Sequence, residues 1–164
     1  MNITIVTSNG EGQTLLSAFD NALQNSGVHN YNLLRLSSII PPHSKIIKKS
    51  SYDTDPAEFG HKLYVVMAEM RSSQAGKHLA AGIGWYQLGD EGGFFVEHET
   101  IGDTRVAVQS EIAFLINSSL RDMCNFRGIA FDENNVKLVV STVKVTNKPA
   151  CALAIAVYQS EGWR

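Results

Sequence analysis

Two adjacent serines, Ser37 and Ser38, are the first residues that could do chemistry. Residues 31–36 have the pattern of a strand leading into them, and Ile-Ile-Pro-Pro follows at positions 39–42. Proline has no backbone donor, so strand pairing should stop at the double proline. Flanks of this kind can hold a peptide bond in a fixed geometry, in which a hydroxyl can attack the preceding carbonyl. Taken alone, the pair is more typical of a simple turn.

Three polar side chains could assist such an attack or a later reaction. Asn32 precedes the serines in the same strand, and its amide could donate to a developing oxyanion. Glu97 follows an apolar strand segment and could act as a proton donor, while Asp20 projects beside the apolar stripe of a helix. The alternatives are an edge-strand asparagine bound to a loop and two solvated surface carboxylates.

The histidines and cysteines do not form a recognisable metal or disulfide pattern. His98 stands between Glu97 and Glu99, but in a strand its side chain faces away from both, so we predict no metal site. Cys124 and Cys151 lie far apart in apolar surroundings, which predicts buried thiols and no disulfide. The common zinc, phosphate-loop and serine-hydrolase motifs are missing from the sequence.

The composition predicts a single globular domain of 164 residues, with 44% hydrophobic and 18% charged residues. The net charge is −2 and the 14 basic residues are scattered, which disfavours nucleic acid as a partner. The sequence has no apolar run of membrane-spanning length and no signal-peptide pattern at its start. We therefore expect no membrane association and a cytoplasmic location.

Helical and strand patterns alternate along the chain and predict an α+β layered domain, with helices covering stacked sheets. Helical spacing covers residues 14–26, with Thr14 as cap and Gly27 at the end, and residues 105–126. Small residues within 76–87 should let layers approach closely. Strand patterns cover residues 3–7, 31–36, 62–70, 76–87, 94–100, 136–145 and 151–158, with a turn at 9–12 and a polar, irregular stretch at 43–60.

Several segments arrive in an order that is similar to one known family. They are Glu-Gly-Gln-Thr at 11–14, Ala-Phe-Asp at 18–20, Asn-Leu-Leu-Arg-Leu-Ser-Ser-Ile-Ile-Pro-Pro at 32–42, Val-Glu-His-Glu at 96–99, Phe-Arg-Gly at 126–128 and Cys-Ala-Leu-Ala at 151–154. On these segments the chain resembles the small pyruvoyl-dependent arginine decarboxylases along nearly its whole length. The string at 32–42 is the most specific part of the match.

The resemblance implies that the chain cuts itself between Ser37 and Ser38. Ser38 would attack the Ser37 carbonyl to form an ester, and elimination followed by loss of ammonia would leave a pyruvoyl group at position 38. Residues 1–37 would become the β chain and residues 38–164 the α chain. The pyruvoyl group would form a Schiff base with the substrate and serve as the electron sink, in place of PLP or a metal. The implied reaction converts L-arginine to agmatine and carbon dioxide.

The resemblance also assigns roles to individual residues. Asn32 would assist processing, Glu97 would be the proton donor, and Asp20 would receive the guanidinium of the substrate. Leu16 would also line the substrate site.

His29 and Tyr31 stand where the family is often glycine-rich, near the distal end of the substrate, and their bulk could change the preferred amino acid. The family further implies a four-layer αββα sandwich assembled as a homotrimer, with active sites between subunits. Two alternatives remain open: a pyruvoyl-dependent decarboxylase of another amino acid, and an unprocessed, non-catalytic oligomeric binding protein.

Overall fold

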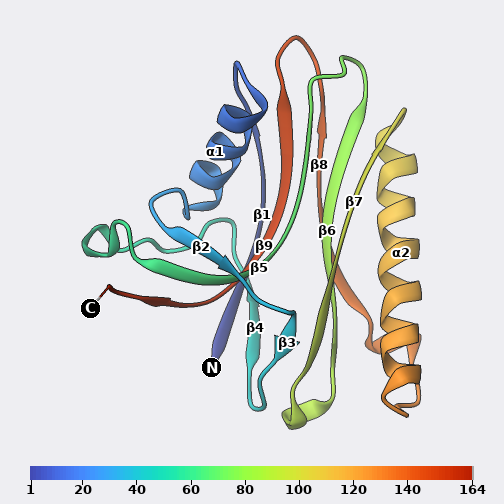
Figure 1. The fold of residues 1–164 in the computed structure, drawn as a ribbon. Helices are drawn as coiled ribbons and strands as arrows, with labels where there is room; N and C mark the ends of the chain where they lie inside the picture. The colour runs from blue at the N-terminus through green and yellow to red at the C-terminus, as the bar shows by residue number, and fades with distance from the viewer. Residues whose placement is uncertain (164) are drawn as a thin grey trace.

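The computed structural model describes residues 1–163, which form two stacked sheets with a helix on each outer side (Figure 1). This arrangement confirms the predicted four-layer αββα sandwich. The elements in chain order are β1 (Asn2–Glu11), α1 (Leu15–Ser26), β2 (Asn32–Arg35), β3 (Ile39–Ile40), β4 (Lys45–Lys48), β5 (Lys62–Ser72), β6 (His78–Gln87), β7 (Gly93–Gly102), α2 (Arg105–Phe126), β8 (Lys137–Lys144) and β9 (Ala150–Glu161).

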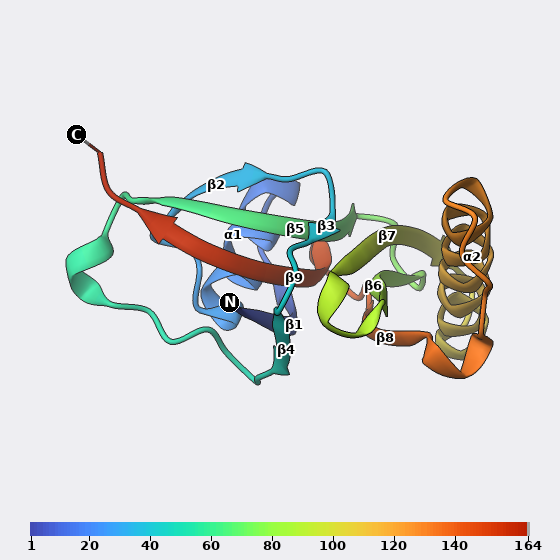
Figure 2. The ribbon, with the colours of Figure 1, turned by 90° about the horizontal axis from the view of Figure 1, so that it is seen from below.

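The first sheet has five strands in the order β2-β5-β9-β1-β4, and the second has four in the order β3-β7-β6-β8. Among the strand pairs of residues 1–163, only β1–β4 and β2–β5 are parallel. Helix α1 covers the outer face of the first sheet and α2 that of the second, and the view from below separates these layers (Figure 2). Strands β2 and β3 are therefore edge strands of different sheets, although only three residues separate them.

Strand β9 shows why the central layers are buried on both sides. Its alanines at 150, 152, 154 and 156 face the second sheet, while Cys151, Leu153, Ile155 and Val157 face α1. This period of two is the side-chain alternation of a strand, and the small alanines let the two sheets pack closely. Both cysteines are buried and free, as predicted.

The predicted ends of α1 are confirmed. The Thr14 hydroxyl accepts a hydrogen bond from the Ser17 backbone N–H at 3.0 Å, and the Ser17 hydroxyl accepts one from the Thr14 N–H at 3.0 Å. This reciprocal pair satisfies two donors at the start of the helix. Gly27 ends the helix in the left-handed region with φ of 85°.

Two glycines of β6 allow α2 to lie directly on the second sheet. A Cβ atom at Gly82 would lie 2.4 Å from Ile112 Cγ2, and one at Gly84 would lie 2.1 Å from Ile116 Cγ2. Real Cβ atoms do not come this close to another atom, so both positions must be glycine if α2 is to pack this closely on β6. The expectation that small residues in 76–87 bring layers together is confirmed.

Two of the expected local structures were wrong. The stretch 43–60 was expected to be irregular, but Lys45–Lys48 forms β4 and pairs in parallel with β1. The expected turn at 9–12 is largely strand, because β1 continues to Glu11 opposite Ala150 of β9. In both cases pairing with a distant strand outweighs the local sequence preference. In the described part of the chain, neither helix has the apolar length that a membrane crossing needs.

Candidate active site

The Ser37-Ser38 pair lies where the chain crosses from one sheet to the other. Before the pair, the Leu36 N–H donates to the Val65 carbonyl of β5 at 2.9 Å. After it, the Phe95 N–H of β7 donates to the Ser38 carbonyl at 2.8 Å. The residues before and after the pair are therefore fixed to different sheets, and the peptide bond between Ser37 and Ser38 connects the two sheets.

Ser38 has a backbone conformation that is unusual for its residue type. Its φ is 69°, in the left-handed region that glycine adopts readily and other residues rarely do. Such a conformation costs about 1–3 kcal/mol and persists only where the surroundings hold it. Ser38 is buried, whereas Ser37 before it is exposed. Backbone strain is thus located at the predicted point of cleavage.

Tyr158 of β9 holds the segment that follows Ser38. Its hydroxyl donates to the Ile39 carbonyl at 2.9 Å, and its ring packs edge-on against Phe95. Burial raises the pKa of Tyr158 above its ordinary value, and the nearby Glu97 carboxylate raises it further. Tyr158 therefore stays a neutral donor at physiological pH and fixes the position of the backbone next to Ser38.

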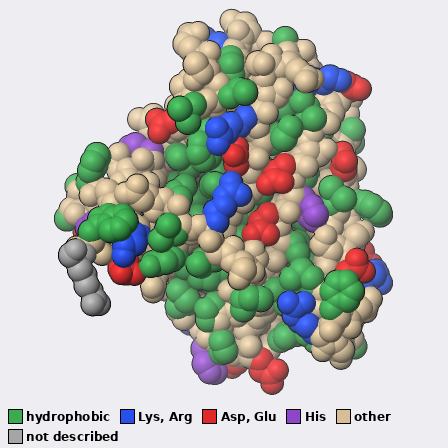
Figure 3. All heavy atoms as spheres, viewed as in Figure 1, with side chains coloured by type: hydrophobic (Ala, Val, Ile, Leu, Met, Phe, Trp, Pro, Cys, Tyr) green, Lys and Arg blue, Asp and Glu red, His purple; other side chains and the backbone are tan. Residues whose placement is uncertain are grey.

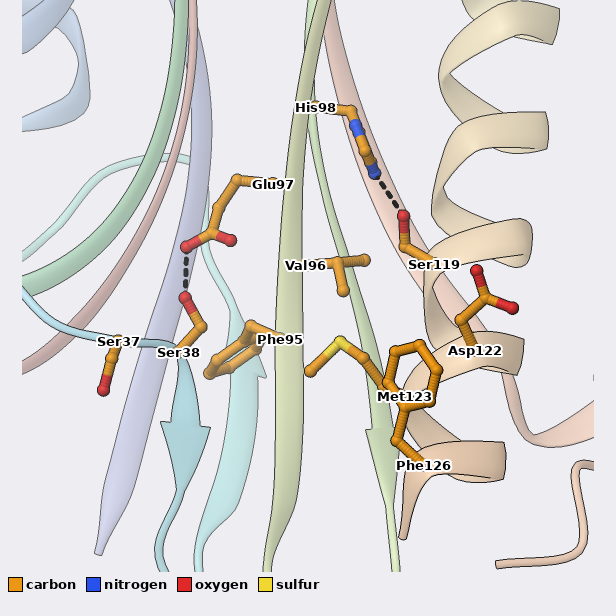
Figure 4. Close-up of a pocket in the computed structure, with 10 residues that line it drawn as sticks. All are labelled: Ser37, Ser38, Phe95, Val96, Glu97, His98, Ser119, Asp122, Met123 and Phe126. Carbon is orange, nitrogen blue, oxygen red and sulfur yellow. Dashed lines mark hydrogen bonds between the residues drawn. The ribbon is translucent and has the colours of Figure 1, made fainter.

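Glu97 reaches Ser38 because of the alternation along β7. Phe95 and Glu97 project toward the first sheet, whereas Val96 and His98 project toward α2. Figure 4 shows the Ser38 hydroxyl pointing at the Glu97 carboxylate, and Ser38 Oγ donates a hydrogen bond to Glu97 Oε1. A carboxylate that accepts this proton is in position to act as its base.

A cavity of about 460 Å³ opens beside this contact. The described residues that line it come from the cleavage segment, from β7 and from α2: Ser37, Ser38, Phe95, Val96, Glu97, His98, Ser119, Asp122, Met123 and Phe126. His98 Nε2 lies 2.8 Å from Ser119 Oγ on α2, so the histidine faces away from Glu97, as predicted. Both faces of β7 reach the cavity because β3 pairs only with Phe94 and Gly93, leaving the strand edge open beyond Ser38.

Charged side chains gather at the centre of the face drawn in Figure 3, over the region where the two sheets meet. On β5, Glu69 accepts two hydrogen bonds from Arg71 at 2.8 Å, and Arg35 lies 4.0 Å away. Glu99 of β7 accepts a hydrogen bond from the Glu69 N–H at 3.3 Å. This last contact links the two sheets two residues beyond Glu97.

Asn32 lies outside the cavity in this chain. Its side-chain amide donates to the Gly60 carbonyl at 2.7 Å, and the Trp163 indole N–H donates to the same oxygen at 2.8 Å. This is the contact of an edge-strand asparagine with a loop. One amide proton and the amide oxygen remain available for a second partner, so a role in processing stays a prediction.

The other predicted substrate residues also lie away from Ser38 within the single chain, and their roles stay predictions. Leu16 and Asp20 are exposed on α1, and His29 is exposed in the loop that follows it. Tyr31 is buried between α1 and the first sheet, and its hydroxyl donates to Glu58 at 2.7 Å. None of the four lines the cavity, because α1 covers the opposite sheet.

The sequence analysis did not predict that residues of α2 line the cavity. Ser119, Asp122, Met123 and Phe126 follow the spacing i, i+3, i+4 and i+7, which places them on one face of a helix. That spacing was available in the sequence, but nothing in it showed that this face meets the cleavage segment. Among residues 1–163, no three histidine, cysteine or acidic side chains gather as metal ligands would.

Comparison with known proteins identifies the family. Residues 2–162 match the family model described as pyruvoyl-dependent arginine decarboxylase. The chain belongs to this family. Curated pyruvoyl-dependent arginine decarboxylases that are similar to it come from Pyrococcus furiosus, 30% identical over 90% of this chain and 87% of the relative, and from Methanothermobacter thermautotrophicus, 30% identical over 96% of each. The protein of that name from Thermococcus kodakarensis is 29% identical over 93% of this chain and 91% of the relative.

Membership in a pyruvoyl-dependent family implies a covalent pyruvoyl group. The site fits such a group at position 38. Ser38 is buried, backbone-strained, hydrogen-bonded through its hydroxyl to a carboxylate, and adjacent to a cavity. In the uncut chain described here, the Ser38 side chain occupies the place from which the group would be formed.

Proposed function

We propose that this chain is a self-processing pyruvoyl-dependent decarboxylase that converts L-arginine to agmatine and carbon dioxide. The observation that carries the proposal is the contact between the Ser38 hydroxyl and Glu97, at a strained residue beside a cavity. The substrate is taken from the names of the relatives, which are arginine decarboxylases along most of the same length.

Cleavage begins when Ser38 Oγ bonds to the Ser37 carbonyl carbon and gives its proton to Glu97. The carbon–nitrogen bond between the serines breaks, and the freed amine takes up a proton, which Glu97 can return. Loss of the Cα proton and cleavage of the Cβ–Oγ bond then release a carboxylate at Ser37 and leave dehydroalanine at 38. Water replaces nitrogen at this Cα, ammonia departs, and a ketone remains. Relief of the strain at Ser38 favours the first step.

The chain's own residues then serve the decarboxylation. When formed, the pyruvoyl group would supply a ketone able to take the substrate amine as a Schiff base and to withdraw electrons as carbon dioxide leaves. Glu97, already in contact with position 38, provides the proton that replaces the lost carboxylate. Phe95 and Val96 are buried, line the cavity from opposite faces of β7, and limit water around the reacting atoms.

A homotrimer with sites between subunits would account for the residues that lie apart in one chain. Leu16 is 69% exposed and Ile39 52% exposed, and Leu34 and Leu36 of the segment leading to the serines are also exposed. Exposed apolar side chains next to an edge strand are typical of a surface that another chain covers. A neighbouring subunit could then bring its Asp20 to the cavity, where that carboxylate would meet a guanidinium.

Three measurements test the proposal. A denaturing gel and intact mass should show two fragments, residues 1–37 and 38–164, with a pyruvoyl mass on the larger one. Ser38→Ala should leave a single uncut chain, because no hydroxyl remains to attack. Light scattering should give the mass of three cut protomers.

Carbon dioxide release across a panel of amino acids separates the alternatives. Arginine should be turned over fastest. If another amino acid replaces it, the pyruvoyl chemistry stands with a different substrate. A full-length band without any turnover would support a non-catalytic binding protein instead.

A further inference from the structure

The segment that begins at Ser38 is hydrogen-bonded mainly to the second sheet. The Phe95 N–H donates to the Ser38 carbonyl at 2.8 Å, and the Ser38 hydroxyl donates to Glu97 of the same strand. Strand β3, which follows directly, also pairs with β7. Among the hydrogen bonds that residues 38–41 form within the described chain, one reaches the first sheet. It is donated by the Tyr158 hydroxyl to the Ile39 carbonyl at 2.9 Å.

This single bond gains importance if the chain is cut. The anchor on the other side of the serine pair is the Leu36 N–H, which donates to the Val65 carbonyl of β5. After cleavage Leu36 would belong to the other fragment, and position 38 would be a chain end. Chain ends are mobile unless they are tied down. Tyr158 would then supply the hydrogen bond that holds this end to the first sheet.

The Tyr158 ring is itself held firmly in place. Strand β9 lies inside the first sheet, between β5 and β1, and Tyr158 is only 9% exposed. Its ring packs edge-on against Phe95 of β7, with centroids 6.2 Å apart, and Phe95 packs edge-on against Trp85 of β6 at 6.3 Å. Three rings from both sheets thus fix the direction of the Tyr158 hydroxyl.

The strained backbone at Ser38 requires anchors of this kind. Its φ of 69° persists only where the surroundings hold it, and the Ile39 carbonyl lies one residue away. The anchors from Leu36 and Phe95 are backbone groups, which a change of side chain leaves in place. Tyr158 is a side-chain anchor, so a substitution can remove its hydrogen bond while the ring remains.

We propose that Tyr158 is a positioning residue for both reactions at position 38. Before the cut it keeps the Ser38 hydroxyl aligned on the Ser37 carbonyl, and after the cut it keeps the new chain end beside Glu97. This inference rests on the proposed function, because it takes position 38 as the point of cleavage and of decarboxylation. Tyr158 acts through the Ile39 carbonyl and contacts none of the reacting atoms.

The test compares Tyr158→Phe with wild type and with Tyr86→Phe. Tyr86 is a matched control, because it is also buried and its hydroxyl accepts a hydrogen bond from the Asp132 N–H at 3.0 Å, on the α2 side of the second sheet. Cleavage of newly made chain is followed on denaturing gels, with and without hydroxylamine. Hydroxylamine breaks an ester between the Ser37 carbonyl carbon and Ser38 Oγ, so it reports how much ester has formed.

Tyr158→Phe should be cut about ten-fold more slowly or worse and should accumulate less ester, because its hydroxyl no longer holds the attacking geometry. Once cut, it should show a similar loss in kcat for arginine, with KM within about three-fold of wild type, since a shift of the reacting end affects the reaction more than binding. Tyr86→Phe should match wild type in cleavage and in kcat.

Cleavage and kcat of Tyr158→Phe at wild-type values would overturn the inference. Equal slowing in Tyr86→Phe would overturn it as well, because any lost buried hydroxyl would then have the same effect. A raised KM with unchanged kcat would place Tyr158 in substrate binding instead.

Wild-type protein that stays uncut would sink the proposed function, and amide hydrogen exchange over residues 36–44 would then decide the inference. Faster exchange in Tyr158→Phe than in wild type would support the anchoring role, and equal exchange would overturn it.

Discussion

Replacing Glu97 by glutamine should separate the geometry of the site from its proton chemistry. Glutamine has nearly the same shape, and its side-chain oxygen can still accept the hydrogen bond that Ser38 Oγ donates to Glu97. An amide cannot take up the hydroxyl proton. A positioned acid–base group contributes about 10²–10⁴-fold to a rate, or about 3–5 kcal/mol of activation free energy. We expect Glu97→Gln to slow self-cleavage by a factor in that range.

The assay is a pulse-labelled translation followed by denaturing gels, which counts cleavage from the moment the chain is made. The decarboxylation rate of the cut protein is then measured for Glu97→Gln and for wild type. Loss of the proton donor should lower kcat in this reaction as well. Glu99→Gln is the matched control, because Glu99 lies on the same face of β7 and glutamine can still accept the Glu69 N–H. Cleavage of Glu97→Gln at the wild-type rate would refute a base role for Glu97, and equal slowing in Glu99→Gln would point to a general effect on the strand.

Two further predictions concern the fold. Gly84→Ala should lower the free energy of unfolding by about 1–3 kcal/mol in urea titrations, because its Cβ would lie 2.1 Å from Ile116 Cγ2; Gly162→Ala, whose Cβ would meet only His61 at 3.4 Å, should have little effect. Burial raises the pKa of the Cys151 thiol from 9.0 to about 12, so the unfolded chain ionises first as pH rises. The free energy of unfolding should therefore fall above pH 9, by up to about 1.4 kcal/mol per pH unit, and Cys151→Ala should remove that part of the slope; an unchanged slope would contradict the assignment.

The helices and most strands could be predicted because their signals are local. Thr14 and Gly27 mark the ends of α1 through side-chain capping and a left-handed residue, both of which depend on adjacent positions. Strand β4 could not be predicted in this way. Its four residues are short and flanked by polar sequence, and they become a strand only by pairing with β1. A segment this short has no recognisable alternation of apolar and polar residues, so its sequence does not indicate pairing with a distant strand.

The same distinction between local signals and distant contacts applies to the residues of the candidate site. Ser38 and Glu97 were predictable as a pair because a specific motif and a family resemblance named both, and the structure brings them into contact. Tyr158 and Asp122 were not, since their relevance depends on which face of β9 and of α2 meets the cleavage segment. Such contacts join residues more than 80 positions apart and follow from the stacking of layers, which local patterns do not encode.

The position of the proposed cut is compatible with a fold that stays intact after cleavage. Residues 1–37 contain β1, which lies inside the first sheet between β9 and β4, and both of these partners belong to residues 38–164. The same fragment contributes α1 and β2, which pack on and pair with the rest of that sheet. Cleavage between the serines would therefore remove one strained connection between the sheets and no strand pairing. The two fragments should stay together as one folded protomer, with the new end at position 38 held beside Glu97 by the Phe95 N–H and the Tyr158 hydroxyl.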